Sequence, residues 1–448
     1  MNEIYTALNL KETATTVGEQ RLPSCFAVSE LAASSIAAVG CAIANLQDAL
    51  NLVNTQPAIQ VDRRLASLWF AQSVHPIDWQ LPPVWDAIAG DYETSNGWIR
   101  IHTNLPHHRV AALQVLETDY RREKVKQAML TWQAGALETE IVNNGGVAAA
   151  MRSRDDWMAH PQGKAVASES LIDWGETRQG KIRPWQPRRS RPLNGLRILD
   201  LTRVLAGPVA SRTLAGFGAE VLRIDPPAWD EPGVVPDISL GKRCCSLDLN
   251  QRNDRHVFEE LLARADLLIH GYRPDALSRL GYDPDTRLRI APALIEVSLN
   301  AYGWTGPWSR RRGFDSLVQM SCGIANSGME WARQDRPTPL PVQALDHATG
   351  YLMAAAAIRA ISMAISADER RSAHLSLART AELLCAYPQD EDRTLTKEPL
   401  PRDFSNAIEA TSWGKAHRLK PALSIAGTPM EWGLPACELG SSPAAWLS

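Results

Sequence analysis

Between residues 194 and 303, short apolar runs alternate with longer segments in which apolar residues recur at helical spacing. Two such segments, 208–219 and 255–265, have the periodicity of helices. The apolar runs predict buried strands at 195–201, 220–225, 244–249, 266–271 and 293–303. Strands that alternate with helices of about ten to fifteen residues indicate βαβ crossovers. The pattern therefore predicts an α/β fold with a doubly wound, mostly parallel, Rossmann-like sheet.

The chain before this region has a different pattern. Residues 81–180 contain one predicted strand at 97–103 and helices around 107–142, which favours a smaller α+β domain. Residues 181–191, KIRPWQPRRSR, carry five basic residues, two prolines and no acid. We interpret this stretch as a solvated linker, with a phosphate-contacting arm as the alternative.

Two Ala-rich stretches suggest an internal repeat. Residues 26–43 resemble 343–360, and residues 59–70 resemble 375–386 about 316 positions later. The matching order and nearly equal offset favour a partial duplication over a coincidence of composition.

Composition limits the classes of function. The 448 residues include 47 Lys and Arg against 50 Asp and Glu, a net charge of −3, which gives no support for a nucleic-acid partner. The seven cysteines form no C-x-x-C pair, so neither a disulfide framework nor a zinc site is predicted. The first twelve residues lack the features of a secretory signal, and the uncharged stretch 31–46 is shorter than a membrane span. We expect a cytoplasmic protein without a membrane partner.

Two loops are candidates for chemistry. The first predicted strand ends in DLTRVLAGP (200–208), where backbone N–H groups at the start of a helix can hold a phosphate. It is not a G-x-G-x-x-G loop, so a nicotinamide dinucleotide is not indicated, and an ordinary strand-to-helix turn is the alternative. The second is ALDHATG (344–350), which places Asp346 near the positive end of a helix. That position is expected to keep the carboxylate ionised and nucleophilic, although a helix-capping role is the alternative.

These segments together resemble one known family. The run 193–227, LNGLRILDLTRVLAGPVASRTLAGFGAEVLRIDPP, is followed by GKRCCSLDL, HGYRPDALSRLGYD, NAYGWTGPWSRRRGFDSLVQMSCGIANSG and ALDHATG. In this order they resemble the class III CoA-transferases, which include formyl-CoA and carnitine CoA-transferases and share their fold with α-methylacyl-CoA racemase. The stretches 90–103 and 143–163 resemble the family's later region, so the chain resembles a permuted or partially duplicated member.

The resemblance implies a covalent mechanism. The family nucleophile is an aspartate before a helix, which matches Asp346. It is expected to form an acyl-aspartyl anhydride and then an aspartyl-CoA thioester, from which an acceptor carboxylate takes the CoA. CoA and acyl-CoA would be substrates, with no permanently bound cofactor and no metal.

The resemblance also implies which residues contact CoA. Lys242, Arg279 and Arg312 are expected to meet phosphates, and Tyr272 to pack on adenine. The full expected set is Val204, Leu205, Ala206, Pro226, Lys242, Gly271, Tyr272, Arg279, Leu280 and Arg312. Two departures stand out: formyl-CoA transferases have glutamine in place of Leu205, and many members have asparagine in place of Gly271.

A racemase is less consistent with the sequence. Racemases of this fold use a His after the Gly of a G-H-D motif as one of two bases, and here Phe314 occupies that position. His347 adjoins Asp346 but, at a neighbouring position of a helix, is expected to point elsewhere.

The resemblance divides the chain into four parts. We expect a partial family copy with the small α+β domain at 1–180, a basic linker at 181–192, the CoA-binding α/β domain with the catalytic Asp at 193–386, and a tail at 387–448 that returns to the small domain or a dimer region. In the partial copy, Ser29 or Glu30 aligns with Asp346, and we expect a structural role there. Family members form interlocked dimers, so a homodimer is expected. The alternative function is a catalytically silent CoA-binding protein or a partner subunit.

Overall fold

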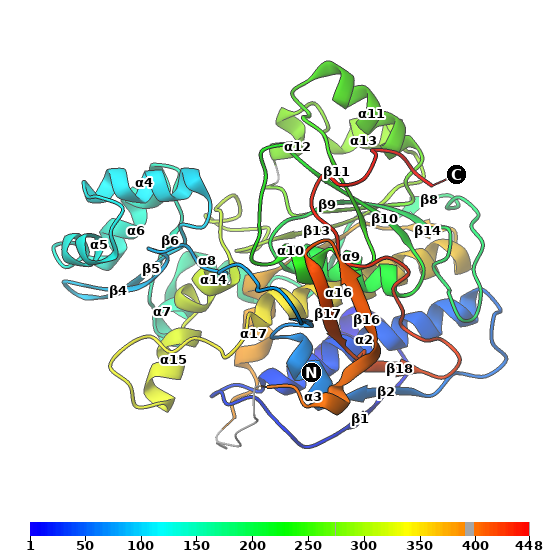
Figure 1. Ribbon diagram of the computed structural model, residues 1–448, viewed down its shortest axis with the longest axis horizontal. Helices are drawn as coiled ribbons and strands as arrows, with labels where there is room; N and C mark the ends of the chain where they lie inside the picture. Colours follow the sequence, from blue (N-terminus) through cyan, green and yellow to red (C-terminus); the bar gives the residue numbers. More distant parts are fainter. Residues whose placement is uncertain (274, 390–397, 448) are drawn as a thin grey trace.

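The computed structural model describes residues 1–448 except 274, 390–397 and 448. A seven-stranded sheet lies at its centre (Figure 1). The strand order is β11 (Arg243–Ser246), β10 (Glu220–Asp225), β9 (Arg197–Leu201), β12 (Leu267–His270), β13 (Ile295–Asn300), β15 (Ala373–Ser376) and β7 (Asp173–Trp174). The first six are parallel, and β7 pairs antiparallel with β15 at the edge. The predicted α/β class with a mostly parallel sheet is confirmed.

Side chains of the sheet alternate between two cores. Ile198 of β9 belongs to the larger hydrophobic core, whereas its neighbours Leu199 and Leu201 belong to a second core. The larger core includes α9 (Ala206–Gly216) and α16 (Ala344–Ser366), and the second includes α11 (Arg252–Ala263), α12 (Ala276–Arg279) and α13 (Pro284–Ile290). Helices therefore cover both faces, which explains why the strands are apolar at successive positions.

A separate small lobe is built from residues 90–150 and lies to the left in Figure 1. It has its own core, to which Tyr92 and Ile99 of the sheet and Leu137 and Ile141 of a helix contribute. Its elements are β4 (Gly90–Thr94), β5 (Gly97–Ile101), β6 (Ala148–Ala150), α4 (Pro106–Leu116), α5 (Arg122–Met129) and α6 (Ala134–Asn143). The sequence predicted a small α+β domain within residues 81–180, and the lobe occupies 90–150 of that range.

The small lobe packs against a helix of the α/β part. A small hydrophobic cluster links Ala149 of β6 to Leu317 and Met320 of a helix from the α/β part. This helix is α14 (Asp315–Ser321), which packs against β5 and β6. The remaining elements of the body are α7 (Arg154–Ala159), α8 (Pro161–Ser168), β8 (Arg178–Gln179) with its partner β14 (Glu369–Arg370), α10 (Val235–Ile238), α15 (Ile324–Trp331) and α17 (Leu377–Cys385).

The long helix α2 (Val28–Ala49) packs along α16 in the larger core. Both helices begin with the same backbone geometry: φ and ψ are −75° and 59° at Ala27 and −75° and 65° at Gln343. In length and composition both resemble membrane spans, but 83% and 89% of their most apolar windows are buried inside the protein. In this structure they pack as core helices.

The remaining N-terminal elements and the tail form two small sheets. One has the order β1 (Thr15–Val17), β2 (Ile59–Asp62) and β18 (Leu423–Ile425), and the other β16 (Phe404–Thr411), β17 (Gly414–Leu419) and β3 (Val74–Pro76). The helices α1 (Asn2–Ala7), α3 (Arg63–Trp69) and the 3₁₀ turn η1 (Pro401–Asp403) complete this part.

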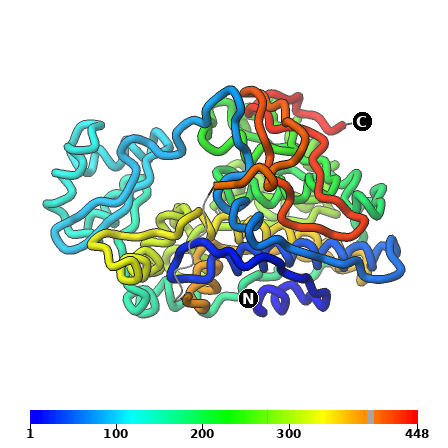
Figure 2. Tube along the Cα trace, turned by 60° about the horizontal axis from the view of Figure 1, so that its bottom comes forward, coloured from blue at the N-terminus to red at the C-terminus, as the bar shows by residue number. Residues whose placement is uncertain are grey.

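The C-terminal tail runs along the α/β part, as the orange-to-red trace in Figure 2 shows. Trp432 stacks on Trp69 at 5.5 Å, and Trp446 donates a hydrogen bond from Nε1 to the Leu261 carbonyl at 3.0 Å. The described tail therefore pairs with the N-terminal segment and the α/β part, whereas the sequence predicted a return to the small domain or a dimer region.

Part of the basic stretch 181–192 is bound to the α/β part, although half of its residues are exposed. Arg183 forms an ion pair with Asp266 at 2.6 Å, and Arg191 donates to the carbonyls of Gly216 and Glu431 at 3.0 and 2.7 Å. These side chains tie the segment to the α/β part, because buried carboxylates and carbonyl groups there need donors. The predicted solvated linker is therefore anchored through Arg183 and Arg191.

Candidate active site

Asp346 lies in the first turn of α16, which begins at Ala344 after the N-cap residue Gln343. Gly350, one turn further on, allows α16 to approach α9 closely, since an added Cβ there would collide with the Ala206 carbonyl oxygen. This contact places Asp346 beside the loop that follows β9. Asp346 does not cap the helix, so the capping alternative is not supported.

A second carboxylate fixes the position of Asp346. The backbone N–H of Asp346 donates to Oδ2 of Asp315 at 2.9 Å. Asp315 is held in turn by Gln319, whose amide donates to Oδ1 and whose carbonyl oxygen accepts the Leu340 N–H at 2.7 Å. The two acids therefore form one buried unit.

Burial decides the protonation of this pair. Burial, together with the nearby charge of Asp315, raises the pKa of Asp346 well above its usual 3.8, and burial raises the pKa of Asp315 to about 6. A helix N-terminus would lower these values, but only by a fraction of the cost of burying two like charges. The expectation that the helix end keeps Asp346 ionised was therefore wrong.

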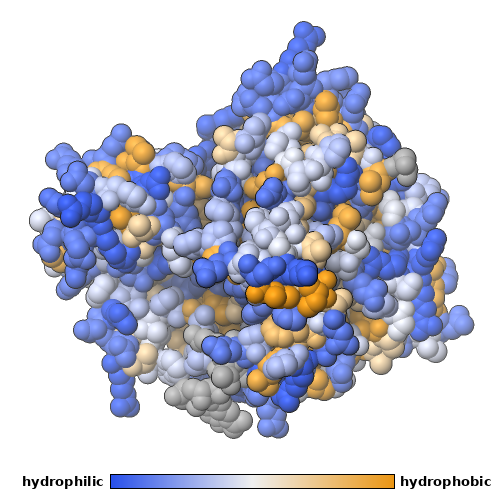
Figure 3. Space-filling view, viewed as in Figure 1, coloured by the Kyte–Doolittle hydropathy of each residue, from blue (hydrophilic) through white to orange (hydrophobic). Residues whose placement is uncertain are grey.

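Two cavities meet at Asp346. The first, which we call the cationic cavity, has a volume of about 380 Å³, and the second, the apolar cavity, has about 260 Å³. Both are also bordered by Leu105, Val204 and Phe314. The outline of the molecule in Figure 3 is indented between the small lobe and the upper part of the α/β domain. Asp346 is the carboxylate common to both cavities.

The cationic cavity lies at the carboxyl ends of β9, β12 and β13. Residues at the ends of these strands or directly after them line it, including Thr202, Gly271 and Asn300. The chain reverses its strand order between β9 and β12, and ligands of open parallel sheets bind at such a crevice. The position of this cavity is therefore that of a ligand site.

Arginines and aromatic rings dominate its wall. Arg203 donates to the Tyr272 hydroxyl at 2.8 Å and lies 4.4 Å from the Trp229 ring centroid. Burial and the neighbouring charge of Arg273 lower the pKa of Arg312, so these two cations lie close together. Clustered guanidinium groups beside aromatic rings suit phosphates and a nucleobase.

Six of the ten predicted CoA contacts lie at these cavities. Val204 borders both cavities, and Leu205 lines the apolar one. Those at the cationic cavity are Ala206, Gly271, Tyr272 and Arg312, together with Val204.

The other four predicted contacts lie elsewhere. Lys242 is buried, and its Nζ donates to Asp200 Oδ2 and to the Pro208 carbonyl, both at 2.9 Å. Arg279 points to solvent with 71% of its side chain exposed and pairs with Asp275. Leu280 packs on the second core, and Pro226 lines neither cavity. The phosphate-binding roles predicted for Lys242 and Arg279 are therefore not supported by their surroundings.

Val204 has a strained backbone. Its φ of 64° is uncommon for a β-branched residue, and its N–H donates to Glu231 Oε1 at 2.6 Å. Glu231 is held by Arg223 at 2.8 Å. Strain of this kind is concentrated at functional sites, where the surrounding structure enforces it.

Sequence reasoning missed His102. This buried residue follows β5, lines the apolar cavity and stacks on Phe314 with ring centroids 3.9 Å apart. Burial, with the charge of Arg100, lowers the pKa of His102 to about 3, so its ring is neutral. The position directly after a strand was its signal, but nothing in the sequence linked it to Phe314 over 200 positions away.

Neither His347 nor the residues of the partial copy that align with Asp346 form a second site of this kind. The His347 ring stacks on Phe70 at 5.1 Å, and His347 lines neither cavity. Ser29 accepts the Leu22 N–H at 2.8 Å, and Glu30 pairs with Arg63 at 3.0 Å. Across the described residues, no group of three metal-ligating side chains is placed to hold a metal ion.

Comparison with known proteins identifies the family. The model of CoA-transferase family III matches residues 193–422, which is half of the chain. The chain belongs to CoA-transferase family III. The matched region contains both carboxylates and the residues that line the cationic cavity, except those from the segment 105–108.

Curated relatives match over part of their length. A mouse succinyl-CoA:glutarate CoA-transferase is 36% identical over 36% of this chain and 39% of its own. An acetyl-CoA:oxalate CoA-transferase of Acetobacter aceti is 34% identical over 30% and 37%, and an acetyl-coenzyme A transferase of Hypoxylon pulicicidum is 34% identical over 38% and 30%. The chain thus spans about a third of the length of these relatives. A crystal structure from Mycobacterium tuberculosis is 28% identical with a TM-score of 0.40, over 44% of this chain and 56% of its own.

Proposed function

We propose that the protein transfers CoA from an acyl-CoA to a carboxylate, with Asp346 as the covalent nucleophile. One observation carries the proposal: Asp346 stands where a cationic cavity and an apolar cavity meet. A thioester joins a polyanionic nucleotide to an acyl group, so its reacting carbonyl belongs at such a junction. The family membership supports the same reaction class.

In the first half-reaction, a carboxylate oxygen of Asp346 attacks the thioester carbonyl. The C–S bond breaks, CoA leaves as a thiolate, and an acyl-aspartyl anhydride remains. The thiolate then attacks the aspartyl carbonyl, releases the donor as a free carboxylate and leaves an aspartyl-CoA thioester. The acceptor carboxylate repeats these two steps in reverse, which regenerates Asp346.

The surroundings of Asp346 support these roles. The apolar side chains of the wall, together with a bound acyl group, would limit the access of water to the anhydride. Arg203, Arg273 and Arg312 would hold the nucleotide phosphates, and Tyr272 would pack on the base. Binding energy from these remote contacts positions the thioester over Asp346.

We further propose the architecture that goes with this function. The strand order and the two covered faces favour a doubly wound, Rossmann-like domain, and the matching starts of α2 and α16 favour a partial duplication. A cytoplasmic location and a homodimer, which is interlocked as in the family, complete the proposal.

Mass spectrometry tests the covalent step. Incubation with an acyl-CoA is expected to leave an adduct on the peptide that contains Asp346, and hydroxylamine is expected to convert it to a hydroxamate. Asp346→Asn removes the nucleophile and is expected to abolish adduct and turnover while CoA still binds. Ser29→Ala in the partial copy is the matched control and is expected to change neither. CoA binding without any adduct would favour a silent CoA-binding protein.

A racemase would need a second base beside Asp346. Phe314 cannot transfer a proton, and the lowered pKa of the neighbouring His102 makes it a weak base. A chiral 2-methylacyl-CoA in deuterated water is therefore expected to keep its α-hydrogen. Exchange at a catalytic rate would contradict the transferase assignment.

A further inference from the structure

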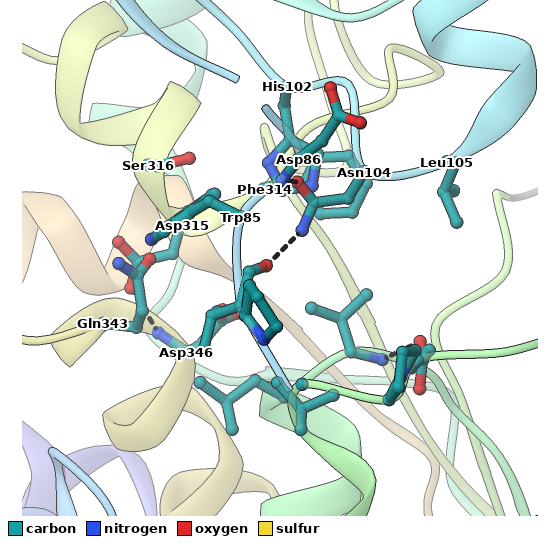
Figure 4. A pocket seen from close by; sticks show the side chains of 18 of the residues that line it. Trp85, Asp86, His102, Asn104, Leu105, Phe314, Asp315, Ser316, Gln343 and Asp346 are labelled. Carbon is teal, nitrogen blue, oxygen red and sulfur yellow. Dashed lines mark hydrogen bonds between the residues drawn. The ribbon is translucent and has the colours of Figure 1, made fainter. Parts of the chain in front are cut away.

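The apolar cavity differs from the cationic cavity in charge. No Lys or Arg lies among the described residues that line it, although it contains the carboxylates of Asp86, Asp230 and Glu231 besides Asp315 and Asp346. Aromatic and aliphatic side chains form much of the remaining wall, among them Val84, Trp85, Leu205 and Phe314. The uncharged polar residues are His102, Asn104, Ser316 and Gln343. In Figure 4, Asp346, Asp315 and Gln343 lie on one side, with His102 and Phe314 on the other.

The cations that neutralise two of these carboxylates do not line the cavity. Arg109 donates to Asp86 at 2.8 Å, and Arg223 donates to Glu231 at 2.8 Å. Asp230 is exposed and has no hydrogen-bond partner among the described residues. A negatively charged end of an acyl group in this cavity would therefore meet Asp230 and find no Lys or Arg among the described lining residues to pair with.

The wall segment 84–86 is held between Asn104 and the loop 229–234. Asn104 donates to the Val84 carbonyl at 2.6 Å and accepts the Asp86 N–H at 3.0 Å. On the other side, an added Cβ on Gly233 would lie 2.9 Å from the Val84 Cα, so the loop 229–234 touches this segment closely. A wall held in this way selects its ligand by size and polarity without a rearrangement.

From these observations we infer that the site accepts monocarboxylic acyl groups with an apolar chain or ring and rejects dicarboxylic ones; the inference rests on the proposed function. A cavity of about 150 Å³ takes a benzene ring, so this one has room for an acyl group of about six to ten carbon atoms. The donor and acceptor acyl groups occupy the same place beside Asp346 in turn. The acceptor therefore belongs to the same chemical class as the donor.

Binding to the Asp346→Asn protein tests this class without turnover. Phenylacetyl-CoA and hexanoyl-CoA are expected to bind at least about tenfold more tightly than CoA, because each buried methylene contributes about fourfold. Succinyl-CoA is expected to bind no more tightly than CoA. Palmitoyl-CoA is expected to gain little over hexanoyl-CoA, since its chain exceeds the cavity.

Variants connect the preference to this wall. Trp85→Ala is expected to lower the affinity for phenylacetyl-CoA relative to CoA by at least about fivefold. Ile77→Ala is the control and is expected to leave this ratio unchanged, because Ile77 is an exposed side chain outside the cavity. Asp230→Lys is expected to improve succinyl-CoA binding by about twofold to fivefold, and Asp285→Lys on α13 is its control.

The two proposals fail separately. Succinyl-CoA binding as tightly as phenylacetyl-CoA would overturn the inferred substrate class, while a succinyl adduct on Asp346 of the wild-type protein would leave the transferase proposal intact. Absence of an adduct with every acyl-CoA in the panel would overturn the transferase proposal. Equal affinities for phenylacetyl-CoA and CoA would overturn the inferred substrate class, whichever acyl-CoAs form an adduct on Asp346.

Discussion

Asp315 accepts the backbone N–H of Asp346 at 2.9 Å, so the carboxylate that orders the nucleophile also opposes its ionisation. The bond is made to the main chain, which leaves the Asp346 carboxyl free of hydrogen bonds from the described residues. An acid with a raised pKa is a stronger nucleophile once ionised, although less of it is ionised at a given pH. The pair thus makes the ionised form of Asp346 more reactive and makes the rate depend on pH.

We expect the rate of adduct formation to rise with pH across a range above that of an ordinary aspartate. Only the ionised form of Asp346 attacks the thioester, and burial with the charge of Asp315 raises its pKa. Asp315→Asn removes that charge and is expected to move the profile to lower pH. Single-turnover rates from pH 4 to 8, measured by quenched mass spectrometry, check this, with Asp285→Asn as an exposed control. An unchanged profile in Asp315→Asn would contradict the coupling.

We expect Asp346→Asn to be more stable than the wild-type protein at neutral pH. A carboxyl whose pKa is raised on folding contributes stability that is full below its unfolded pKa and is lost as pH rises through its folded pKa. The amide does not ionise, so its advantage is expected to appear as pH rises and to vanish in acid. Thermal unfolding is expected to show a gain of roughly 1 to 3 °C at neutral pH. A lower Tm for the variant at neutral pH would contradict the burial cost.

The strands β9 to β13 could be predicted from the sequence because most of their residues are buried. The short strands β7 and β15 were not predicted. The predicted strand 220–225 coincides with β10, and the predicted helix 208–219 corresponds to α9 at Ala206–Gly216. Continuous apolar runs between helices carry this signal locally. The covering of both faces follows from the same local pattern.

The site was only partly predictable because its other half comes from distant segments. Asp346 and the loop 204–206 lie at motif positions, whereas Trp85 and His102 reach the cavity from the N-terminal third. Nothing local in the sequence encodes that approach. The stacking of His102 on Phe314 depends on how the small lobe docks, which periodicity does not describe.

Charge in the sequence was a poor guide to the phosphate site. A basic residue next to a strand looks the same whether it faces solvent, ligand or core. Lys242 was predicted as a ligand contact, but its partner Asp200 on β9 lies 42 positions away. Arg203 and Arg273, which line the cationic cavity, were not singled out.

We expect Cys437 to be the first thiol to react with iodoacetamide near neutral pH. A hydrogen bond from Cys244 lowers the pKa of Cys437 to about 7, and Cys437 is partly exposed. Cys25 is also partly exposed, but burial raises its pKa to about 11. Peptide mapping after brief alkylation is the measurement, and Cys437→Ser is expected to remove the fast phase. Faster labelling of Cys25 would contradict the assignment.

We expect Arg312→Ala to weaken CoA binding by about 1 to 2 kcal/mol, because Arg312 lines the cationic cavity and a charge-assisted bond to phosphate contributes on this order. Arg279→Ala is the matched control and is expected to change the affinity by less than about 0.5 kcal/mol, since Arg279 is exposed and pairs with Asp275. Calorimetry at two salt concentrations measures both. An equal loss of CoA-binding free energy in the two variants would indicate that Arg279 also contacts CoA.

The ion pair of Lys242 and Asp200 gives a prediction about folding. Burial alone would raise the pKa of Asp200, but the charges of Lys242 and Arg223 outweigh it and keep that pKa below its usual value. Ser211 and Thr202 also donate to Asp200. The Asp200 carboxylate, near the carboxyl end of β9, is therefore ionised. Thr202 lies two residues before Val204 in the loop that follows β9, so the position of this loop depends on the pair.

Lys242→Met is therefore expected to lower the free energy of unfolding by about 3 to 5 kcal/mol, because it leaves a buried carboxylate without its cation. Adding Asp200→Asn to this variant is expected to restore part of the loss, since the remaining group is neutral. Urea unfolding of the two single variants and the double variant gives the coupling energy. If Lys242 instead held a CoA phosphate, Lys242→Met would keep its stability and lose CoA affinity, and that result would return it to the ligand site.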